Sequence, residues 1–207
     1  QIAIAKFPDD ASTPVEIAAS STFQDRWWAK QGLWSLASVN PNCWATAVAN
    51  VANVSEGDFA LIQETKIFQE SMRKVAGTTG TGGCAVLARI GTGISGNQNN
   101  LIPEALAHRI TIAWVSAIAK GGFYLASVYL RDCVGMNAEN KLICEHAAAL
   151  VRALDGPCII AGDWNMTPEV LARSGFLGMV NGTIFSPELE TCNGKVYDFF
   201  VVTNNFV

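Results

Sequence analysis

Residues 158–168 read Cys-Ile-Ile-Ala-Gly-Asp-Trp-Asn-Met-Thr-Pro. The apolar start of this stretch is typical of a short buried β-strand, and it ends in a glycine followed by an acid and an amide. Because side chains alternate along a strand, Asp163 and Asn165 are predicted to share one face, with Trp164 on the other. Paired oxygen groups at a strand end suit metal-assisted phosphoryl chemistry. On its own, however, this pair is more typical of a simple turn.

The composition of the whole chain restricts the possible functions. The 207 residues, of which 50% are hydrophobic, are enough to bury the core of a single domain. Only 15% of the residues are charged and the net charge is −4, so the composition does not predict the basic surface by which many proteins bind nucleic acid. If the substrate is a phosphodiester, bound cations must offset much of the repulsion. No apolar run approaches the roughly 20 residues that span a bilayer.

The six cysteines do not predict a metal site. They contain no Cys-x-x-Cys pair and have no accompanying His cluster, so zinc is not expected. Cys84 and Cys158 lie in apolar, strand-like runs, where a reduced thiol is the ordinary interpretation. No basic flank followed by an apolar stretch marks a signal peptide, and an intracellular location is favoured. The chain begins with Gln1, and we expect it to be a processed product, a piece of a longer polypeptide or part of a larger complex.

Strands and helices alternate in some parts of the chain and strands pair as hairpins in others. Strands are predicted over 33–40, 58–64, 84–90, 157–161 and 196–202, and a hairpin joins 110–119 to 123–130. Helices are predicted over 46–54, 137–154 and 168–174, with a short one over 21–31, and residues 97–100 are predicted to be an exposed loop. The pattern indicates an α/β (α+β) fold in layers. Residues 1–32 are assigned to an N-terminal extension of uncertain order.

Further polar residues fall at or near the ends of the predicted strands. They are Asn40 and Asn42 after the first strand, Glu64 in Gln63-Glu64-Thr65, Tyr129 at the end of the hairpin, and Asp198 at the start of the last strand. Each of them alone is ordinary in a structural role. Their occurrence in this order, together with Gly-Asp-Trp-Asn, is a much sharper signal.

With these motifs the sequence resembles the endonuclease/exonuclease/phosphatase superfamily, which includes deoxyribonuclease I, abasic-site endonucleases and retrotransposon endonucleases. The resemblance extends from about Leu33 to the last residue. It implies a four-layer, deoxyribonuclease I-like sandwich, in which two packed mixed β-sheets are flanked by helices and the active site lies at one rim of the sheets.

The resemblance also implies a metal site and a catalytic role for each motif. Glu64, helped by Asn40 and Asn42, would hold Mg²⁺ or Mn²⁺ through oxygen ligands. Asp163 would orient and deprotonate the attacking water, and Asn165 would hydrogen-bond the phosphoryl oxygen.

The resemblance implies roles around the phosphate for two more residues, and two others are candidates for binding the substrate. Tyr129 would position it, and Asp198 would add to the metal or phosphate shell. Asp132 occupies a position that is often Asn in the family, and Arg109 is a candidate phosphate contact before a predicted strand.

The sequence departs from the family at its C-terminal end. Family members close with Ser-Asp-His on one further strand, whereas this chain ends at residues 203–207 before any such element, and neither His108 nor His146 matches it. We therefore expect residues 33–207 to form the family's domain without its last strand. The leading hypothesis is a Mg²⁺-dependent phosphodiester hydrolase, an endonuclease acting on nucleic acid. A truncated or degenerate domain that serves as a binding or structural subunit, and a lipid or inositol phosphate phosphodiesterase or phosphatase, stay open as alternatives.

Overall fold

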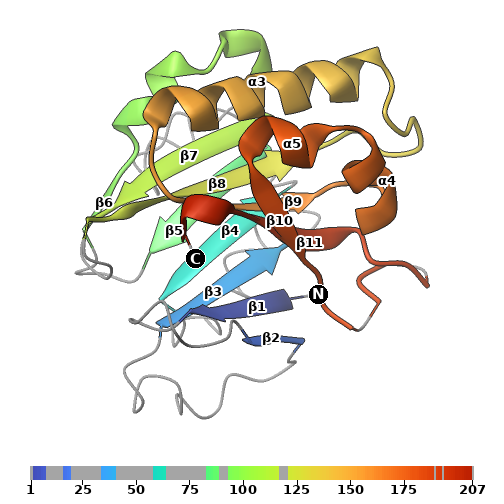
Figure 1. The fold of residues 1–207 in the computed structure, drawn as a ribbon, viewed down its shortest axis with the longest axis horizontal. Coiled ribbons are helices and arrows are strands. Elements are labelled where there is room, and N and C mark those ends of the chain that lie inside the picture. Colours follow the sequence, from blue (N-terminus) through green and yellow to red (C-terminus); the bar gives the residue numbers. More distant parts are fainter. Residues whose placement is uncertain are drawn as a thin grey trace.

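The strands of the protein form two sheets that pack face to face (Figure 1). The computed structural model describes residues 2–7, 16–19, 34–40, 58–63, 83–88, 93–116, 121–188, 190–192 and 194–206. None of the helices in these ranges combines the length and the apolar character that a bilayer crossing requires.

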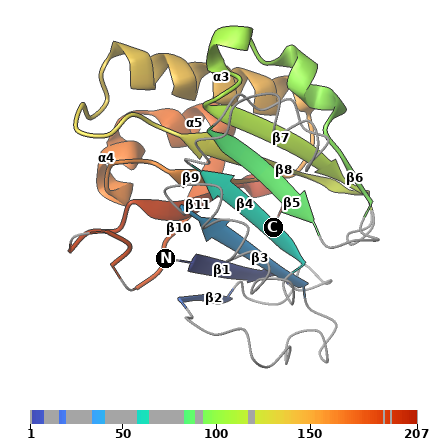
Figure 2. The ribbon, with the colours of Figure 1, turned by 180° about the vertical axis from the view of Figure 1, so that it is seen from behind.

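The first sheet has five strands in the order β2-β1-β3-β4-β5, and it lies in front when the molecule is seen from behind (Figure 2). Its strands are β1 Ile2–Phe7, β2 Glu16–Ala19, β3 Trp34–Val39, β4 Phe59–Gln63 and β5 Cys84–Ala88. β3 and β4 run parallel, and the other neighbours are antiparallel. The ends of β3 and β4 therefore point to the same edge of the sheet.

The second sheet has six strands in the order β10-β11-β9-β8-β7-β6. They are β6 Ile94–Ser95, β7 Ile110–Val115, β8 Phe123–Tyr129, β9 Cys158–Asp163, β10 Gly182–Phe185 and β11 Asp198–Thr203. β8 and β9 are parallel, and β11 runs antiparallel beside β9. Consequently β8 and β9 end where β11 begins.

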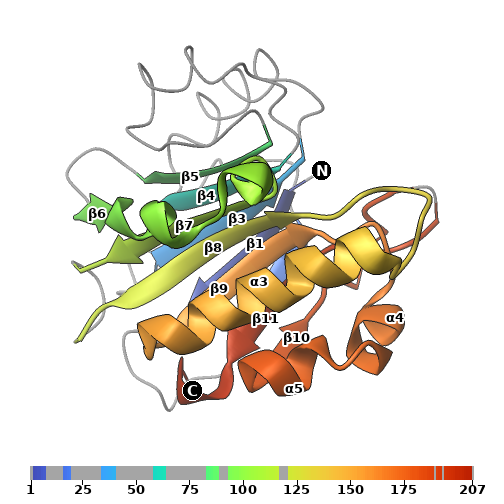
Figure 3. The ribbon, with the colours of Figure 1, turned by 90° about the horizontal axis from the view of Figure 1, so that it is seen from above.

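The described α-helices cover the outer face of the six-stranded sheet (Figure 3). They are α3 Ala138–Leu154, α4 Pro168–Arg173 and α5 Phe176–Val180, and short 3₁₀ helices span η2 Asn97–Leu101, η3 Glu104–Leu106 and η4 Asn204–Phe206. The Asn137 side chain caps α3 by accepting a hydrogen bond from the backbone N–H of Asn140. At the other end of α3, Asp155 adopts the left-handed conformation that closes many helices.

Strand β9 shows why the central strands are apolar along their whole length. Ile159 and Ala161 belong to the core between the two sheets, whereas Cys158 and Ile160 belong to the core under the helices. Both faces of the strand are buried, so it reads as a continuous apolar run instead of an alternating one.

The structure confirms the predicted fold class, with two packed mixed sheets and flanking helices. All predicted strands reappear, as do the helices near residues 137–154 and 168–174. The predicted helices over 21–31 and 46–54 lie outside the described residues, and so does any layer that they form. The domain division after residue 32 stays a prediction.

Other expectations were incomplete or wrong. The sequence did not predict β1 and β2, although β1 pairs with β3 over its full length, and it missed β6, α5 and β10. Residues 97–100 are not a simple exposed loop, because they form most of η2. The half-buried Asn99 side chain holds this helix on β7 by donating to the Ile112 carbonyl at 2.8 Å and accepting from its N–H at 2.9 Å.

Candidate active site

The predicted polar residues meet where the parallel strands end. Asp163 is the last residue of β9, and its register partners are Tyr129, the last residue of β8, and Asp198, the first residue of β11. Asn40 directly follows β3 of the other sheet. Three strands of one sheet and one of the other thus deliver side chains to a common rim.

Asp163 is held from both sheets. Its Oδ2 accepts a hydrogen bond from Asn40 Nδ2 at 2.6 Å, and its Oδ1 accepts one from the Asn165 backbone N–H at 3.1 Å. The residue is only 5% exposed. The carboxylate therefore has a fixed orientation across the gap between the sheets.

The Gly-Asp-Trp-Asn motif has a packing explanation. Trp164 is fully buried under the helices, and its indole N–H donates to the Phe199 carbonyl at 3.0 Å. A Cβ at position 162 would lie 2.7 Å from the Trp164 ring, so this close approach requires glycine. Asp163 and Trp164 face opposite sides, as predicted.

Asn165 reaches the site through a turn and not, as the alternation implied, as a continuing strand. β9 ends at Asp163, and Asn165 has a φ of 49°, a left-handed conformation that Asn tolerates better than most residues. Its side-chain amide donates to the Leu130 carbonyl at 2.8 Å. This bond leaves the second N–H of the amide for another acceptor.

Asp198 is a buried acid that is poorly satisfied. It is 7% exposed, and its Oδ1 has no hydrogen-bond partner. Burial raises the pKa of Asp198 to about 6, and a side-chain hydrogen bond with Thr191 opposes that rise. The Thr191 hydroxyl also accepts from the backbone N–H groups of Tyr197 and Asp198, at 2.8 and 3.0 Å. A hydrogen-bond donor or a cation next to this oxygen would therefore stabilise the ionised carboxylate.

Positive charge lies beside Tyr129, which is the neighbour of Asp163 in the sheet. The guanidinium of Arg109 stacks over the ring of Tyr129, with its central carbon 4.6 Å from the ring centroid. The Nε and Nη1 of Arg109 are buried without a hydrogen-bond partner. Burial, with Arg109 and Arg131 nearby, lowers the pKa of His108, which favours the neutral imidazole.

Some predicted residues are not brought together here. Asp132 is exposed on the loop after β8, and its side chain accepts a hydrogen bond from the Cys133 thiol instead of contacting another predicted site residue of the described ranges. Glu64 and Asn42 lie outside the described residues. Within the described ranges, no group of three His, Cys, Asp or Glu side chains is arranged to hold a metal.

Polar residues outside the predicted site form buried hydrogen bonds beside the rim. Gln63 donates to the Ser127 hydroxyl at 3.2 Å, and its Oε1 accepts from the Ser38 hydroxyl at 3.3 Å, so both sheets are joined by buried hydrogen bonds. Thr191, which binds the Asp198 backbone, was also missed. Serine and threonine carry no sequence signal that separates such roles from ordinary strand or turn positions.

A separate pocket of about 270 Å³ lies between α3 and the segment from η2 to β7. Its lining is apolar apart from His146, and it contains none of the acids described above. The pocket therefore does not match the chemistry that the motifs predict.

The chain is similar in fold to several solved structures. An AP endonuclease from Leishmania major has 13% identity and a TM-score of 0.57, over 83% of this chain and 79% of that one. The catalytic domain of human Nocturnin has 12% identity and a TM-score of 0.53, over 82% and 81%. A 3′-5′ exonuclease from Neisseria meningitidis has 14% identity and a TM-score of 0.51, over 81% and 86%. Neither a family model nor a curated protein matches the sequence.

These likenesses identify the fold of the protein. The chain has the fold of the endonuclease/exonuclease/phosphatase superfamily, as the motifs predicted. At identities this low, the likeness concerns the fold, and the chemistry has to be argued from the residues themselves.

Proposed function

We propose that the protein is a Mg²⁺-dependent phosphodiester hydrolase that acts on nucleic acid. The observation that carries the proposal is the meeting of Asp163, Asp198 and Asn40 at one rim, contributed by both sheets. The fold it shares with an AP endonuclease and a 3′-5′ exonuclease supports phosphodiester hydrolysis in general.

The residues at the rim fit a hard divalent cation. Carboxylate and amide oxygens are the ligands that Mg²⁺ prefers, and the buried, unpartnered Oδ1 of Asp198 is an oxygen that a cation would satisfy. Asp198 and Asn40, with Glu64 and Asn42 outside the described ranges, are the residues that would hold it. When bound, the ion supplies charge stabilisation and lowers the pKa of a bound water.

The chain's own residues divide the remaining work. Asp163 is oriented by two hydrogen bonds, so it is placed to accept the proton of the attacking water. Asn165 keeps one side-chain N–H for a phosphoryl oxygen, which gains charge as the reaction proceeds.

Arg109 and Tyr129 are proposed to bind the phosphate. The Arg109 guanidinium has two buried nitrogens without partners and rests on the Tyr129 ring, so an anion at the rim would satisfy it. The net charge of −4 means that the chain as a whole does not attract a polyanion. Binding of the substrate therefore depends on the local positive charge of Arg109 and of the bound Mg²⁺.

The test is Mg²⁺-dependent nicking of supercoiled plasmid, compared with hydrolysis of phosphoinositide and sphingomyelin vesicles. We expect nicking by the unaltered protein, and a loss of at least 100-fold in Asp163→Asn and Glu64→Gln, in line with the 10²–10³ usually lost with one transition-state contact. Asp155→Asn is the matched control, because it changes an exposed acid at the C-terminal end of α3.

Two results would contradict the proposal. Nicking that survives in both Asp163→Asn and Glu64→Gln would place the chemistry elsewhere or in a contaminant. Hydrolysis of the lipids without nicking would mean that the protein is a phosphodiesterase whose substrate is a lipid and not nucleic acid.

A further inference from the structure

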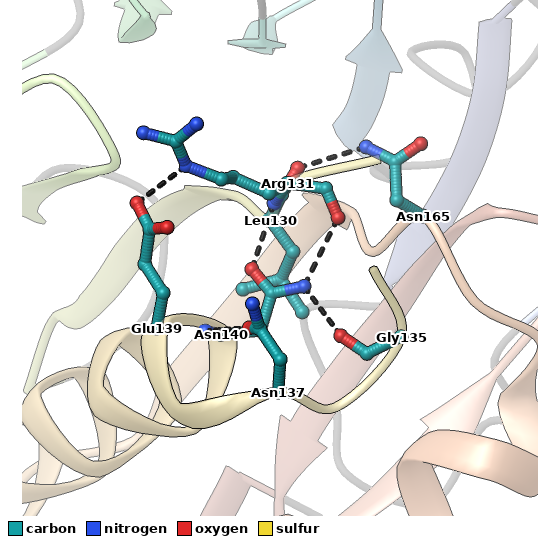
Figure 4. A network of polar contacts seen from close by, with 7 residues as sticks. All are labelled: Leu130, Arg131, Gly135, Asn137, Glu139, Asn140 and Asn165. Atoms are coloured by element: carbon teal, nitrogen blue, oxygen red, sulfur yellow. Dashed lines mark hydrogen bonds and ion pairs between the residues drawn. The ribbon is translucent and has the colours of Figure 1, made fainter. Parts of the chain in front are cut away.

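Asn140 is a fully buried polar residue in the first turn of α3, and it belongs to none of the motifs discussed above. Its Oδ1 accepts from the backbone N–H of Arg131 at 2.8 Å. Its Nδ2 donates to the carbonyls of Arg131 and Gly135, at 3.0 and 2.7 Å (Figure 4). A flipped amide would oppose all three partners, so the contacts fix its orientation.

These contacts reach Asn165 through a single peptide unit. The carbonyl of Leu130 and the N–H of Arg131 belong to the same peptide bond, which is planar and rigid. Asn165 Nδ2 donates to that carbonyl at 2.8 Å, while Asn140 Oδ1 accepts from that N–H (Figure 4). The two asparagines therefore hold opposite edges of one peptide, and a rotation of that peptide would move the acceptor that orients Asn165.

Other contacts anchor the same loop without contacting the Leu130–Arg131 peptide. Asn137 caps α3 through the Asn140 backbone at 2.9 Å, and the exposed side chains of Arg131 and Glu139 form an ion pair. Neither contact involves the Leu130 carbonyl or the Arg131 N–H. A variant at Asn137 can therefore weaken the loop and the helix end while leaving the link to Asn165 intact.

We propose that Asn140 is a positioning residue that fixes the Asn165 side chain through the Leu130–Arg131 peptide. Only an amide at this position offers the one acceptor and two donors that its partners require. The consequence for catalysis rests on the proposed function, whereas the structural link does not.

The first test is independent of activity and follows the side-chain amide of Asn165 by NMR, with the resonance assigned by its loss in Asn165→Ala. In Asn140→Ala we expect this resonance to shift and its hydrogen exchange to accelerate at least 10-fold. Asn137→Ala, a matched change three residues away, should leave it in place. An Asn165 amide that is unchanged in Asn140→Ala would overturn the proposal.

Measurements of kcat and KM then distinguish a role in positioning Asn165 from a general loss of structure in the loop. If the protein hydrolyses phosphodiesters, Asn140→Ala should lower kcat about 10-fold with little change in KM, and should cause no further loss in an Asn165→Ala background. An equal loss in both backgrounds would overturn the role. If the unaltered protein hydrolyses nothing, the proposed function fails and the NMR result alone decides the link.

A measurement on the unaltered protein covers the case in which Asn140→Ala does not fold. We expect a correlation across the hydrogen bond from the Arg131 N–H to the Asn140 side-chain carbonyl. Its absence from a spectrum that shows the backbone hydrogen bonds of α3 would refute the link.

Discussion

Replacing Asp198 with Asn is expected to stabilise the metal-free protein at neutral pH. The folded state raises the pKa of this acid from an ordinary 3.8 to about 6. Between these values the folded chain binds more protons than the unfolded chain, so the free energy of unfolding falls as pH rises. At about 1.36 kcal/mol for each pKa unit, the penalty reaches about 3 kcal/mol above pH 6. Asn resembles the protonated acid, so the variant avoids this penalty.

The assay compares thermal unfolding of the two proteins in EDTA from pH 3.5 to pH 8. For a chain of this size, about 3 kcal/mol corresponds to a rise in Tm of about 6–12 °C at pH 8. The gain should shrink as pH falls through 6 and vanish below pH 3.8, where Asp198 is protonated in both the folded and the unfolded chain. Glu188→Gln, at an exposed position outside the helices, is the control and should follow the unaltered protein throughout.

The same two proteins can also be compared by thermal unfolding in Mg²⁺. An ion that binds the folded state raises its stability, and the carboxylate of Asp198 is proposed to contact that ion. Mg²⁺ should therefore raise the Tm of the unaltered protein more than that of Asp198→Asn. A difference between the two proteins that does not depend on pH, or a variant that is less stable at pH 8, would refute the reasoning about Asp198.

Three further predictions follow from local contacts. Gly162→Ala should cost about 1–3 kcal/mol in chemical denaturation, because the new methyl would overlap the Trp164 ring, whereas Gly178→Ala, in open space on α5, should cost nothing. Thr191→Val should lower the free energy of unfolding by about 1–3 kcal/mol and lower kcat, because the backbone N–H groups of Tyr197 and Asp198 lose their acceptor. Unchanged activity would show that Thr191 does not belong to the site. In native protein at pH 8, a thiol reagent followed by mass spectrometry should label the exposed cysteines of the described ranges, Cys133 and Cys192, before the buried ones. The buried cysteines of these ranges are Cys84 and Cys144, whose pKa burial raises to about 12, and Cys158, whose pKa burial also raises. Early labelling of a buried thiol would contradict the packing.

The central strands could be predicted from the sequence because burial on both faces gives a continuous apolar run. β4 and β9 are such strands, and an acid marks the end of each, Glu64 directly after β4 and Asp163 as the last residue of β9. The first two strands lack this signal: β1 carries Lys6 within a short run, and β2 has only four residues. Their place depends on pairing with β3, which is a tertiary contact and leaves no local pattern.

The candidate site could be predicted in part for a similar reason. The resemblance implied that Asp163, Asn40 and Asp198 share one rim. They meet there because β9 ends where the antiparallel β11 begins and because Asn40 reaches Asp163 from the other sheet. The link from Asn140 to Asn165 could not be predicted, since it needs the path of the loop between β8 and α3. In the sequence, Asn140 is only one more polar residue near a helix start.

The core between the sheets differs between the rim of the candidate site and the opposite rim. Where β3, β4 and β8 begin, the rings of Trp34, Phe59 and Phe123 pack with centroids 5.1–6.2 Å apart. Such aromatic pairs add about 0.5–1.5 kcal/mol each beyond the area that they bury.

Where the same strands end, buried hydrogen bonds replace the rings, and Gln63 joins Ser127 to Ser38 across the gap. A satisfied polar network fixes the sheets relative to each other without surrounding the neighbouring acids with hydrocarbon. An aromatic cluster at this end would desolvate Asp198 further and add to the rise in its pKa that burial already causes. The aromatic end therefore stabilises the fold, and the polar end joins the two sheets beside the edge where Asp163 and Asp198 meet.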